Sequence, residues 1–220
     1  MALSELLLLR DFLSEAAGHA CFTCSFQAED VVVLHLLLQE QPDIPVLFLE
    51  TGYHFPDLLQ YRDRLVESWG VNLMNIASHI SREQQEEQFG KLYRTDPSAC
   101  CRLRKVEPLF RMLENYSVWF TGLRREQAST RANLQVVETA MLPSGRTLRK
   151  VSPLAMWKWN EVWSYLRVNE IPTAPLYDVG YASIGCQPCT TPPTDPVNAR
   201  SGRWGGTKLE CGIHACAKRN

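Results

Sequence analysis

Continuous runs of apolar residues, without polar alternation, mark several strands of this chain. Residues 46–49 are such a run, and a Thr-Gly pair follows at 51–52. Residues 117–120, largely apolar, also end at a Thr-Gly pair. Runs of this kind are typical of parallel strands that are covered on both faces. Stretches with helical periodicity separate them. The pattern predicts helices over 5–16, 28–39, 57–69, 81–89, 100–113 and 160–168, and strands over 20–25, 46–49, 71–76, 117–120, 133–138 and 147–151.

The alternation of strand and helix predicts the fold class. It indicates an α/β fold with a doubly wound, mainly parallel sheet and helices on both faces. From about residue 172 onward, Pro, Gly and Thr dominate and the periodicity is lost. We therefore expect a nucleotide-binding α/β domain over 1–171. A loop-rich C-terminal segment over 172–220 is expected to lie over the same structural domain.

The charge balance and the apolar runs narrow the function classes. The 220 residues carry 23 Lys and Arg against 24 Asp and Glu, a formal net charge of −1, which disfavours a general nucleic-acid binder. No apolar run approaches the ~20 residues of a membrane span. The leucines at 6–9 stop at Arg10 and have no basic residue before them, which is untypical of a signal peptide. We expect a cytoplasmic protein with no membrane partner.

Eight cysteines are the unusual feature of the composition, and they fall into groups at 21 and 24, 100 and 101, 186 and 189, and 211 and 216. In a long intracellular chain, grouped cysteines are more typical of metal ligands or catalytic thiols than of disulfides. Cys21 and Cys24 are the exception. They lie on a predicted strand, where residues three apart point to opposite faces, so we interpret them as core residues.

The pairs Cys100-Cys101 and Cys186-x-x-Cys189 supply four thiols that one metal centre could bind. Neighbouring side chains on a helix diverge by ~100°, which strains a tetrahedral site for a single ion. A cubane cluster spreads its irons over several ångströms and accommodates such a pair more easily. The spacing therefore favours a [4Fe–4S] cluster over zinc, with a zinc site or unrelated core cysteines as the alternatives.

Cys211 lies near the chain end, after a segment rich in Gly and Arg. A thiol next to basic groups is a candidate nucleophile, because nearby cations favour the reactive thiolate. His214, three residues on, either orients or deprotonates this thiol or only caps the tail. Cys211 as an exposed bystander stays an alternative, and Cys216 is interpreted as one.

Cationic clusters and one turn suggest a small anionic ligand. The turn at 25–30, which begins with Ser25, joins the first predicted strand to its helix, a common nucleotide site. It lacks the glycines of a phosphate cradle, so a plain turn remains an alternative. Lys105 lies one helical turn beyond Cys101. The remaining candidate anion ligands are Arg124, Arg125, Arg131, Arg200 and Arg203, with solvated surface charge as the alternative for each.

Six motifs together resemble the assimilatory adenylyl-sulfate (APS) reductases, relatives of the 3′-phosphoadenylyl-sulfate (PAPS) reductases. These are SFQAED at 25–30, ETGYHFP at 50–56, TGLRR at 121–125, YASIGCQPC at 181–189, ARSGRW at 199–204 and ECGIH at 210–214. The resemblance covers nearly the whole chain, and its last three motifs, in this order, are the most specific. Glu50 departs from it, since many relatives carry Asp there.

The resemblance implies the fold of the adenine-nucleotide α-hydrolases and an enzyme that reduces APS to sulfite and AMP. It implies a [4Fe–4S] cluster on Cys100, Cys101, Cys186 and Cys189, Cys211 as the nucleophile, and thioredoxin or a similar dithiol protein as reductant. Members that use PAPS usually lack both cysteine pairs, so their presence favours APS. The alternatives are a PAPS reductase, an ATP pyrophosphatase-type sulfurtransferase and a non-enzymatic metal protein; a homo-oligomer is left open.

Overall fold

Helices and strands alternate along the chain in a computed structural model, which describes residues 3–195 and 198–214. The elements before the middle of the chain are α1 (Leu3–Ala16), β1 (Ala20–Thr23), α2 (Ala28–Glu40), β2 (Val46–Glu50), α3 (Pro56–Trp69), β3 (Leu73–Ala77), α4 (Arg82–Phe89), α5 (Leu92–Thr95) and α6 (Pro97–Cys101). A π-helical turn (Arg102–Val106) leads into α7 (Glu107–Leu113), β4 (Val118–Phe120), β5 (Val137–Met141), β6 (Thr147–Val151) and α8 (Trp159–Val168).

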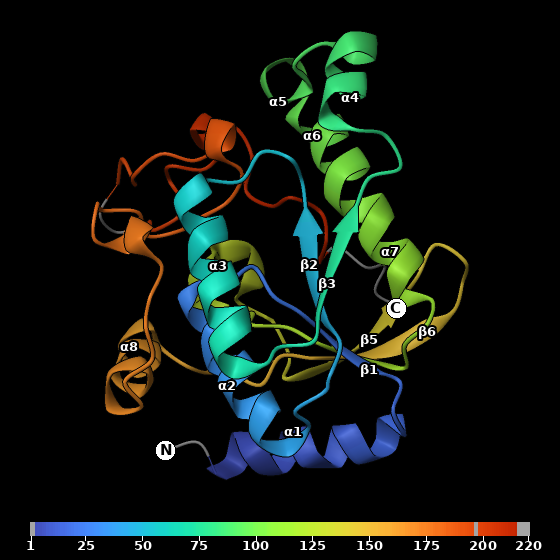
Figure 1. Ribbon diagram of the computed structural model, residues 1–220, viewed down its shortest axis with the longest axis vertical. Helices are drawn as coiled ribbons and strands as arrows, with labels where there is room; N and C mark the ends of the chain where they lie inside the picture. The colour runs from blue at the N-terminus through green and yellow to red at the C-terminus, as the bar shows by residue number, and fades with distance from the viewer. Residues whose placement is uncertain (1–2, 196–197, 215–220) are drawn as a thin grey trace.

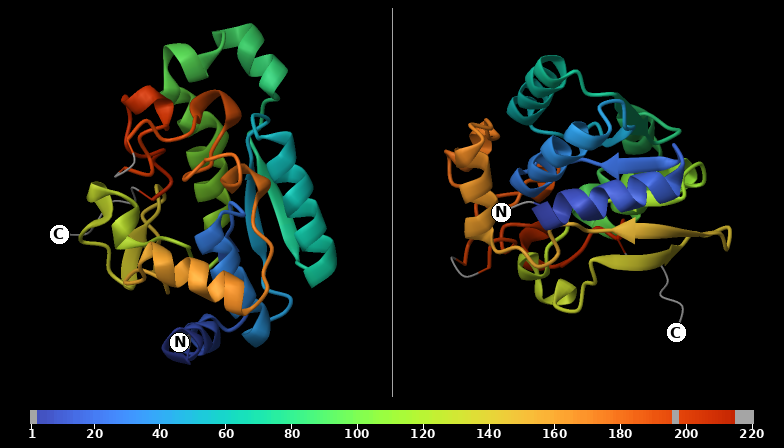
Figure 2. Two further views of the ribbon diagram at one scale, coloured as in Figure 1. Left: turned by 90° about the vertical axis from the view of Figure 1, so that its left-hand side faces the viewer. Right: turned by 90° about the horizontal axis from the view of Figure 1, so that it is seen from below.

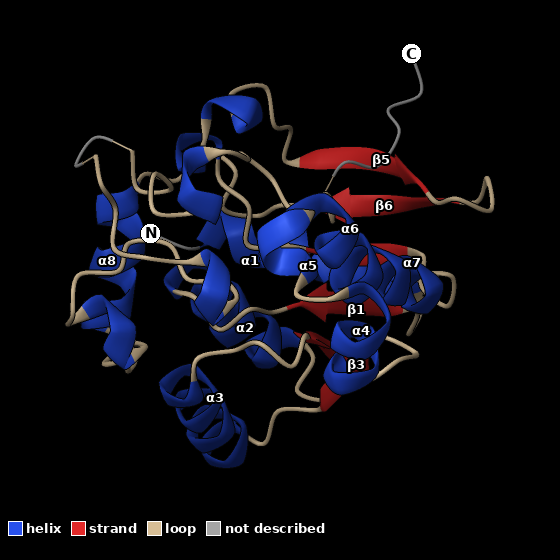
Figure 3. Cartoon of the chain, turned by 90° about the horizontal axis from the view of Figure 1, so that it is seen from above, coloured by secondary structure: helices blue, strands red, loops and turns tan. Residues whose placement is uncertain are grey.

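The six strands of the described residues form one sheet in the order β3-β2-β1-β4-β6-β5. All pairings are parallel except β5 with β6. Figure 3 shows the strands from β5 at one side through β6 and β1 to β3 at the other. The expected α/β class with a mainly parallel sheet is confirmed. The strand order reverses between β1 and β4, and open α/β sheets bind ligands outside the carboxyl ends of strands at such a point.

Two apolar cores cover the two faces of the sheet. The larger core joins the sheet to α1, α2, α3 and α8, and the smaller one joins it to α7 through Leu109 and Leu113. Cys24 belongs to the larger core and Cys21 to the smaller, so the two thiols point to opposite faces, as predicted. Figure 1 shows α4, α5 and α6 projecting beyond the carboxyl ends of β2 and β3.

Most predicted elements are present with small shifts, and two differ. The predicted helix over 100–113 is interrupted by the π-helical turn directly after Cys101. The strand predicted from residue 133 begins only at Val137, because Leu134 donates its backbone N–H to the carbonyl of Arg131 in a turn (2.9 Å). Ser81 caps α4 and forms a reciprocal capping box with Gln84.

The segment after α8 contains short 3₁₀ turns at Pro175–Tyr177, Gln187–Cys189 and Trp204–Gly206, and the loop-rich prediction is confirmed for its described residues. Figures 1 and 2 show it, orange to red, returning toward the end of the molecule that carries α4–α6. Cys216 lies outside the described residues. Among the described helices, none has the length and apolar character needed to cross a membrane.

Candidate active site

A cleft of about 720 Å3 opens at the carboxyl ends of the central strands. The loops after β1, β2 and β4 line one side, and residues of the C-terminal segment line the other. Of the residues predicted from the sequence, the cleft is lined by Ser25, Lys105, Arg124, Arg131, Arg200, Arg203, Cys211 and His214. Arg125 is not among the lining residues; its Nε donates to the backbone carbonyl of Leu134 (2.7 Å). The topology thus brings together groups that are up to 189 residues apart in the sequence.

The turn after β1 is shaped by its own side chains. Phe26 has a φ of 58°, a left-handed conformation that a residue with a side chain rarely adopts, and its ring is fully buried. Asp30 accepts hydrogen bonds from the backbone N–H and the hydroxyl of Ser25. A Cβ at Gly122 would lie 2.0 Å from Asp30 Oδ1, so only glycine lets the loop after β4 approach this turn. The two loops at the switch point are therefore fitted to each other.

Two cations of the cleft, Lys105 and Arg203, form no ion pair with a described carboxylate. A third, Arg200, forms one long ion pair, from Nη2 to Oε2 of Glu210 (3.5 Å). The Nε groups of Arg200 and Arg203 are buried without a hydrogen-bond partner in the described part of the chain. Buried donors of this kind normally have partners, so these are suited to an anionic ligand.

Burial is the largest influence on the pKa of each of these cations, and it lowers all three. A Cys211 thiolate opposes it in every case, which places the Cys211 sulfur within electrostatic reach of Lys105, Arg200 and Arg203. With the sulfurs of Cys186 and Cys101 acting in the same direction, the net pKa of Lys105 is raised. The pKa of Arg200 falls to about 10, which still leaves it protonated at neutral pH.

Two other predicted anion ligands are already paired. Arg124 is buried and binds Glu29 with both Nε and Nη2 (3.2 and 2.8 Å), while its Nη1 contacts Glu126 (2.9 Å). Arg131 forms a fork with Glu210, from Nε to Oε1 (2.8 Å) and from Nη2 to Oε2 (2.7 Å). Both guanidinium groups line the cleft but direct these donors to protein carboxylates.

The tail that carries Cys211 lies against the cleft. Ile213 packs against the smaller core, and the ring of His214 stacks on Trp119, with centroids 5.6 Å apart and an interplanar angle of 16°. Burial holds the pKa of His214 well below its usual range, so its imidazole is neutral. In the described residues, no hydrogen bond joins His214 to Cys211, and His214 Nδ1 is buried without a partner.

A second, small cavity adjoins the cleft and is lined by all four predicted metal ligands, Cys100, Cys101, Cys186 and Cys189. Lys105 and Arg203 line both cavities. Burial, with charge repulsion from neighbouring sulfurs, raises the pKa of Cys100 to about 11 and that of Cys189 to about 12. No three Cys, His, Asp or Glu side chains of the described chain are close enough to hold one metal ion.

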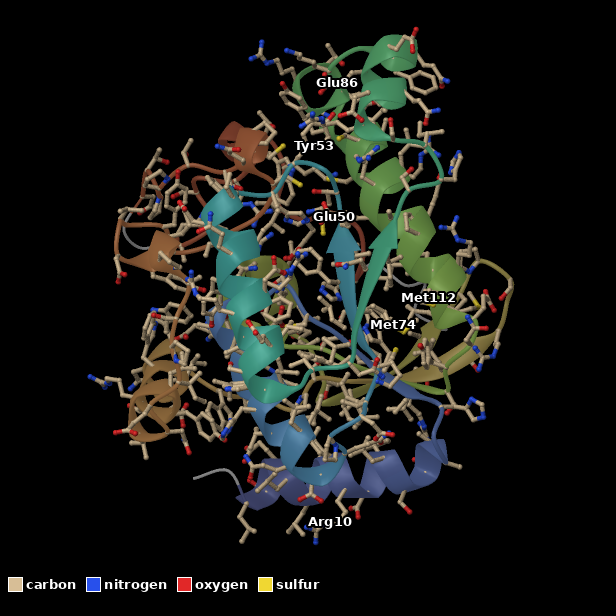
Figure 4. The ribbon with its side chains drawn as sticks, in the orientation of Figure 1. Arg10, Glu50, Tyr53, Met74, Glu86 and Met112 are labelled. Atoms are coloured by element: carbon tan, nitrogen blue, oxygen red, sulfur yellow. The ribbon has the colours of Figure 1, made fainter. Side chains whose placement is uncertain are left out.

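Polar groups around this cavity fix its walls. Arg104 is buried and donates from Nε to the carbonyl of Thr51 (2.5 Å) and from Nη1 to Gln85 (3.2 Å). Thr51 Oγ1 lies 3.4 Å from the sulfur of Cys186. Tyr53, in the loop after β2, donates to Glu86 of α4 (2.8 Å), and Figure 4 labels both residues at this end of the molecule. These contacts attach α4 and the π-helical turn to the sheet.

Sequence reasoning did not single out Arg104, Thr51, Gly185 or Glu210. Gly185 has a specific role, because a Cβ there would lie 2.1 Å from Nη2 of Arg203. Both Gly185 and Glu210 belong to motifs that the sequence analysis quotes, at 181–189 and 210–214, so position within those motifs was the available signal. Thr51 lies in the quoted motif at 50–56, whereas Arg104 lies in none of the motifs, and their contact joins residues 53 positions apart.

Comparisons with known proteins agree with this arrangement. Residues 19–192 match the family model of the phosphoadenosine phosphosulfate reductase domain. The chain is 44% identical over 189 residues to the adenosine 5′-phosphosulfate reductase of Rhodococcus erythropolis, covering 85% of this chain and 75% of the relative. It is 41% identical over 203 residues to the adenosine 5′-phosphosulfate reductase of Geobacillus kaustophilus, covering 91% and 85%. The crystal structure of a phosphoadenylyl-sulfate reductase from Candida auris, in complex with phosphate, superposes with a TM-score of 0.70 at 25% identity, covering 86% of this chain and 94% of that one.

Proposed function

The chain belongs to the phosphoadenosine phosphosulfate reductase family, and from this premise we propose that it reduces adenosine 5′-phosphosulfate (APS) to sulfite and AMP in assimilatory sulfate reduction. One observation carries the proposal: Cys211 lines the same cleft as Lys105, Arg200 and Arg203. A thiol beside three cations is suited to attack an anionic, activated sulfate. The names of the relatives in Rhodococcus and Geobacillus support APS as the substrate.

In the first step, the Cys211 thiolate attacks the sulfur of the sulfonate group. The new S–S bond forms as the bond from sulfur to the bridging oxygen breaks, so AMP leaves with that electron pair and S-sulfocysteine remains. A thiolate approaching an anion is repelled, by about 4 kcal/mol for one unit-charge pair at ~4 Å and an effective dielectric of ~20. Lys105, Arg200 and Arg203 offset this repulsion.

In the second step, a thiolate of thioredoxin or a similar dithiol protein attacks Sγ of Cys211. Sulfite leaves with the electron pair of the S–S bond, and a mixed disulfide forms. The second thiol of the reductant then resolves this disulfide and frees Cys211. The two electrons that reduce the sulfonate come from the dithiol, which is oxidised to a disulfide.

The four cysteines of the small cavity fit a [4Fe–4S] cluster, and we propose it as the cofactor. Thiolates are the donors that such clusters take. Four sulfurs around one cavity, with no three described donors close enough for a single ion, suit a polynuclear cluster better than tetrahedral zinc. When bound, the cluster supplies a local charge and a rigid centre and needs no redox role here. Lys105 and Arg203 line both cavities, so each would carry its charge next to both the bound cluster and the substrate.

The other predicted residues take lesser roles in this proposal. We assign His214 to support of the tail through its stacking on Trp119, because an imidazole whose pKa is lowered so far is a weak base for the Cys211 thiol. Ser25 lines the nucleotide side of the cleft. Arg124, Arg125 and Arg131 contribute positive potential, although each also binds protein groups. The seven described cysteines are free thiols, as a reducing cytoplasm favours.

The decisive experiment is sulfite release from APS by anaerobically purified protein with reduced thioredoxin, compared with Cys211→Ser. We expect turnover by the native protein and none by the variant. Mixing with APS alone should add one SO3 group to Cys211, observed by mass spectrometry of the intact protein and its peptides. An unmodified Cys211 alongside AMP release would refute the covalent step.

A PAPS reductase is the second candidate, and the Candida auris structure supports it only at the level of the family. The two cysteine pairs, at 100 and 101 and at 186 and 189, favour APS, since members that use PAPS usually lack both pairs. Parallel measurement of kcat/KM with APS and PAPS separates the two. A higher value with PAPS would transfer the assignment to the second candidate.

A further inference from the structure

The carboxylate of Glu210, the residue before the nucleophile, is contacted by three polar side chains. Arg131 grips its two carboxylate oxygens at 2.8 and 2.7 Å, and the Thr130 hydroxyl donates to Oε1 at 2.9 Å. Nη2 of Arg200 lies 3.5 Å from Oε2 and donates to the carbonyl of Leu209 at 3.0 Å. The tail is thus bound through two consecutive residues directly before Cys211.

The ion pair is shielded enough to be strong. The side chain of Arg131 is 11% exposed and that of Glu210 is 26% exposed. Parallel, charge-assisted bonds of this fork type fix orientation as well as distance. Burial favours a protonated Glu210, but the hydrogen bonds and charges of Arg131 and Arg200 overcome it and lower the pKa of Glu210. The carboxylate is therefore charged, and the pair is intact, throughout the neutral range.

The position of this pair in the chain sets the position of the thiol. The Cα atoms of Glu210 and Cys211 are joined by one peptide and lie ~3.8 Å apart, so fixing Glu210 restricts where Cys211 can lie. Beyond Cys211, Ile213 packs on the smaller core and His214 stacks on Trp119. Cys211 therefore lies between a polar anchor on one side and an apolar anchor on the other. Gly212, with a φ of 97°, turns the chain between them.

We propose that Glu210 is a positioning residue, whose fork with Arg131 holds Cys211 in the cleft for attack on the substrate. The inference rests on the proposed function, because it assigns a step of that reaction to the anchor. The proposal also changes the role of Arg131, whose guanidinium binds Glu210 of the tail and not the substrate. Glu210 itself touches no reacting atom.

The test separates positioning from substrate binding in a single turnover with APS and no reductant. The rate of Cys211 sulfonation and its dependence on APS concentration are measured for the native protein, Glu210→Gln, Arg131→Gln and the double variant. Glu87→Gln, an exposed glutamate on α4, is the matched control. We expect the maximal rate to fall about tenfold in each variant that lacks the fork, as for the loss of one charge-assisted bond, with the half-saturating APS concentration within about twofold. The double variant should be no slower than either single one, because both remove the same pair.

A second readout follows the tail without substrate. Alkylation of Cys211 by iodoacetamide, quantified on its peptide, should be about tenfold faster in Glu210→Gln than in the control, because the tail leaves the cleft more often. A rate of sulfonation and of alkylation within twofold of native in Glu210→Gln would overturn the proposal. So would tighter APS binding in Glu210→Gln with weaker binding in Arg131→Gln, since Arg131 would then serve the substrate. Failure of the native protein to form S-sulfocysteine would instead refute the proposed function.

Discussion

Gly185→Ala tests how the cleft holds the buried guanidinium of Arg203. A Cβ at position 185 would lie 2.1 Å from Nη2, 2.4 Å from Cζ and 2.9 Å from Nη1 of Arg203. The backbone at Gly185 is outside the left-handed region, so alanine is compatible with the chain conformation. The guanidinium, at the end of a flexible side chain, is therefore the group that must move, by about 1 Å or more to reach ordinary contact distance.

The displacement changes function more than stability. Arg203 loses its bond to the Ser183 hydroxyl (3.1 Å) and its position over Trp204 (4.5 Å to the ring centroid), while the unfolded chain loses some backbone freedom. These effects partly cancel, so the free energy of unfolding should fall by no more than about 2 kcal/mol. A charge-assisted contact to the substrate is worth about 1.5–3 kcal/mol, which predicts a 10- to 150-fold loss in kcat/KM for APS.

The assay is steady-state sulfite release, run with Gly185→Ala, Arg203→Ala and the double variant. If the methyl group acts through Arg203, then Gly185→Ala should have no further effect in the Arg203→Ala background. Urea denaturation of the same proteins checks that the fold survives. Additive losses in the double variant, or native kcat/KM in Gly185→Ala, would show that the methyl group does not act through Arg203. Native kcat/KM in Arg203→Ala would show that Arg203 has no part in binding the anion.

Three further predictions address the cofactor and the fold. Cys101→Ser should lose bound iron and acid-labile sulfide, whereas the core variant Cys21→Ser keeps both; iron retained in Cys101→Ser would contradict the cluster assignment. Gly122→Ala should destabilise the protein by about 3 kcal/mol in urea, because its Cβ meets the side chain and backbone of Asp30 at 2.0 and 3.0 Å; a native midpoint would contradict this packing. Burial raises the pKa of Asp30 to about 6 from 3.8, so its protonated form stabilises the fold at low pH, and this contribution is lost as the pH rises through about 6. The stability of the native protein relative to Asp30→Asn should therefore fall by about 3 kcal/mol between pH 3 and pH 7, and parallel curves would refute it.

Local patterns in the sequence predicted the elements and the fold class. Residues 46–49 lie in β2, and β4 lies within 117–120, as expected. Apolar runs of this kind are typical of parallel strands that are covered on both faces. The π-helical turn after Cys101 was not predicted, since its residues are ordinary helix formers and the extra residue is accommodated only by contacts with β2 and α4. The prediction of strand at 133–136 was wrong for a similar reason, because the backbone N–H of Leu134 is bonded to the carbonyl of Arg131 in a turn.

The chemistry of the cations was the part that sequence could not resolve. A run such as Arg124-Arg125 gives the same signal whether its guanidinium groups bind substrate, carboxylates or carbonyls. The carboxylate that binds Arg124 is 95 positions away, and the one that binds Arg131 is 79 away. Only the strand order places those partners, and pairing at such distances leaves no local periodicity to read. The four cysteines of the small cavity and Cys211, by contrast, carry chemistry in the residue type itself. Spacing singled out the four as candidate ligands, and basic neighbours singled out Cys211 as a candidate nucleophile.

Ion pairs explain how a chain of net charge −1 keeps unpaired positive charge in its cleft. Glu29 and Glu126, which line the cleft, bind Arg124, and Glu210 binds Arg131. Asp30, which also lines the cleft, accepts hydrogen bonds from Ser25 instead. Lys105 and Arg203 have no carboxylate ion pair in the described ranges, and they lie where the two cavities meet. The potential at that point is therefore set by which carboxylates are kept away, as much as by how many cations are present. A small anion is attracted where cations lack carboxylate partners. This arrangement therefore concentrates a phosphosulfate beside Cys211, while the rest of the surface has no strong preference for polyanions.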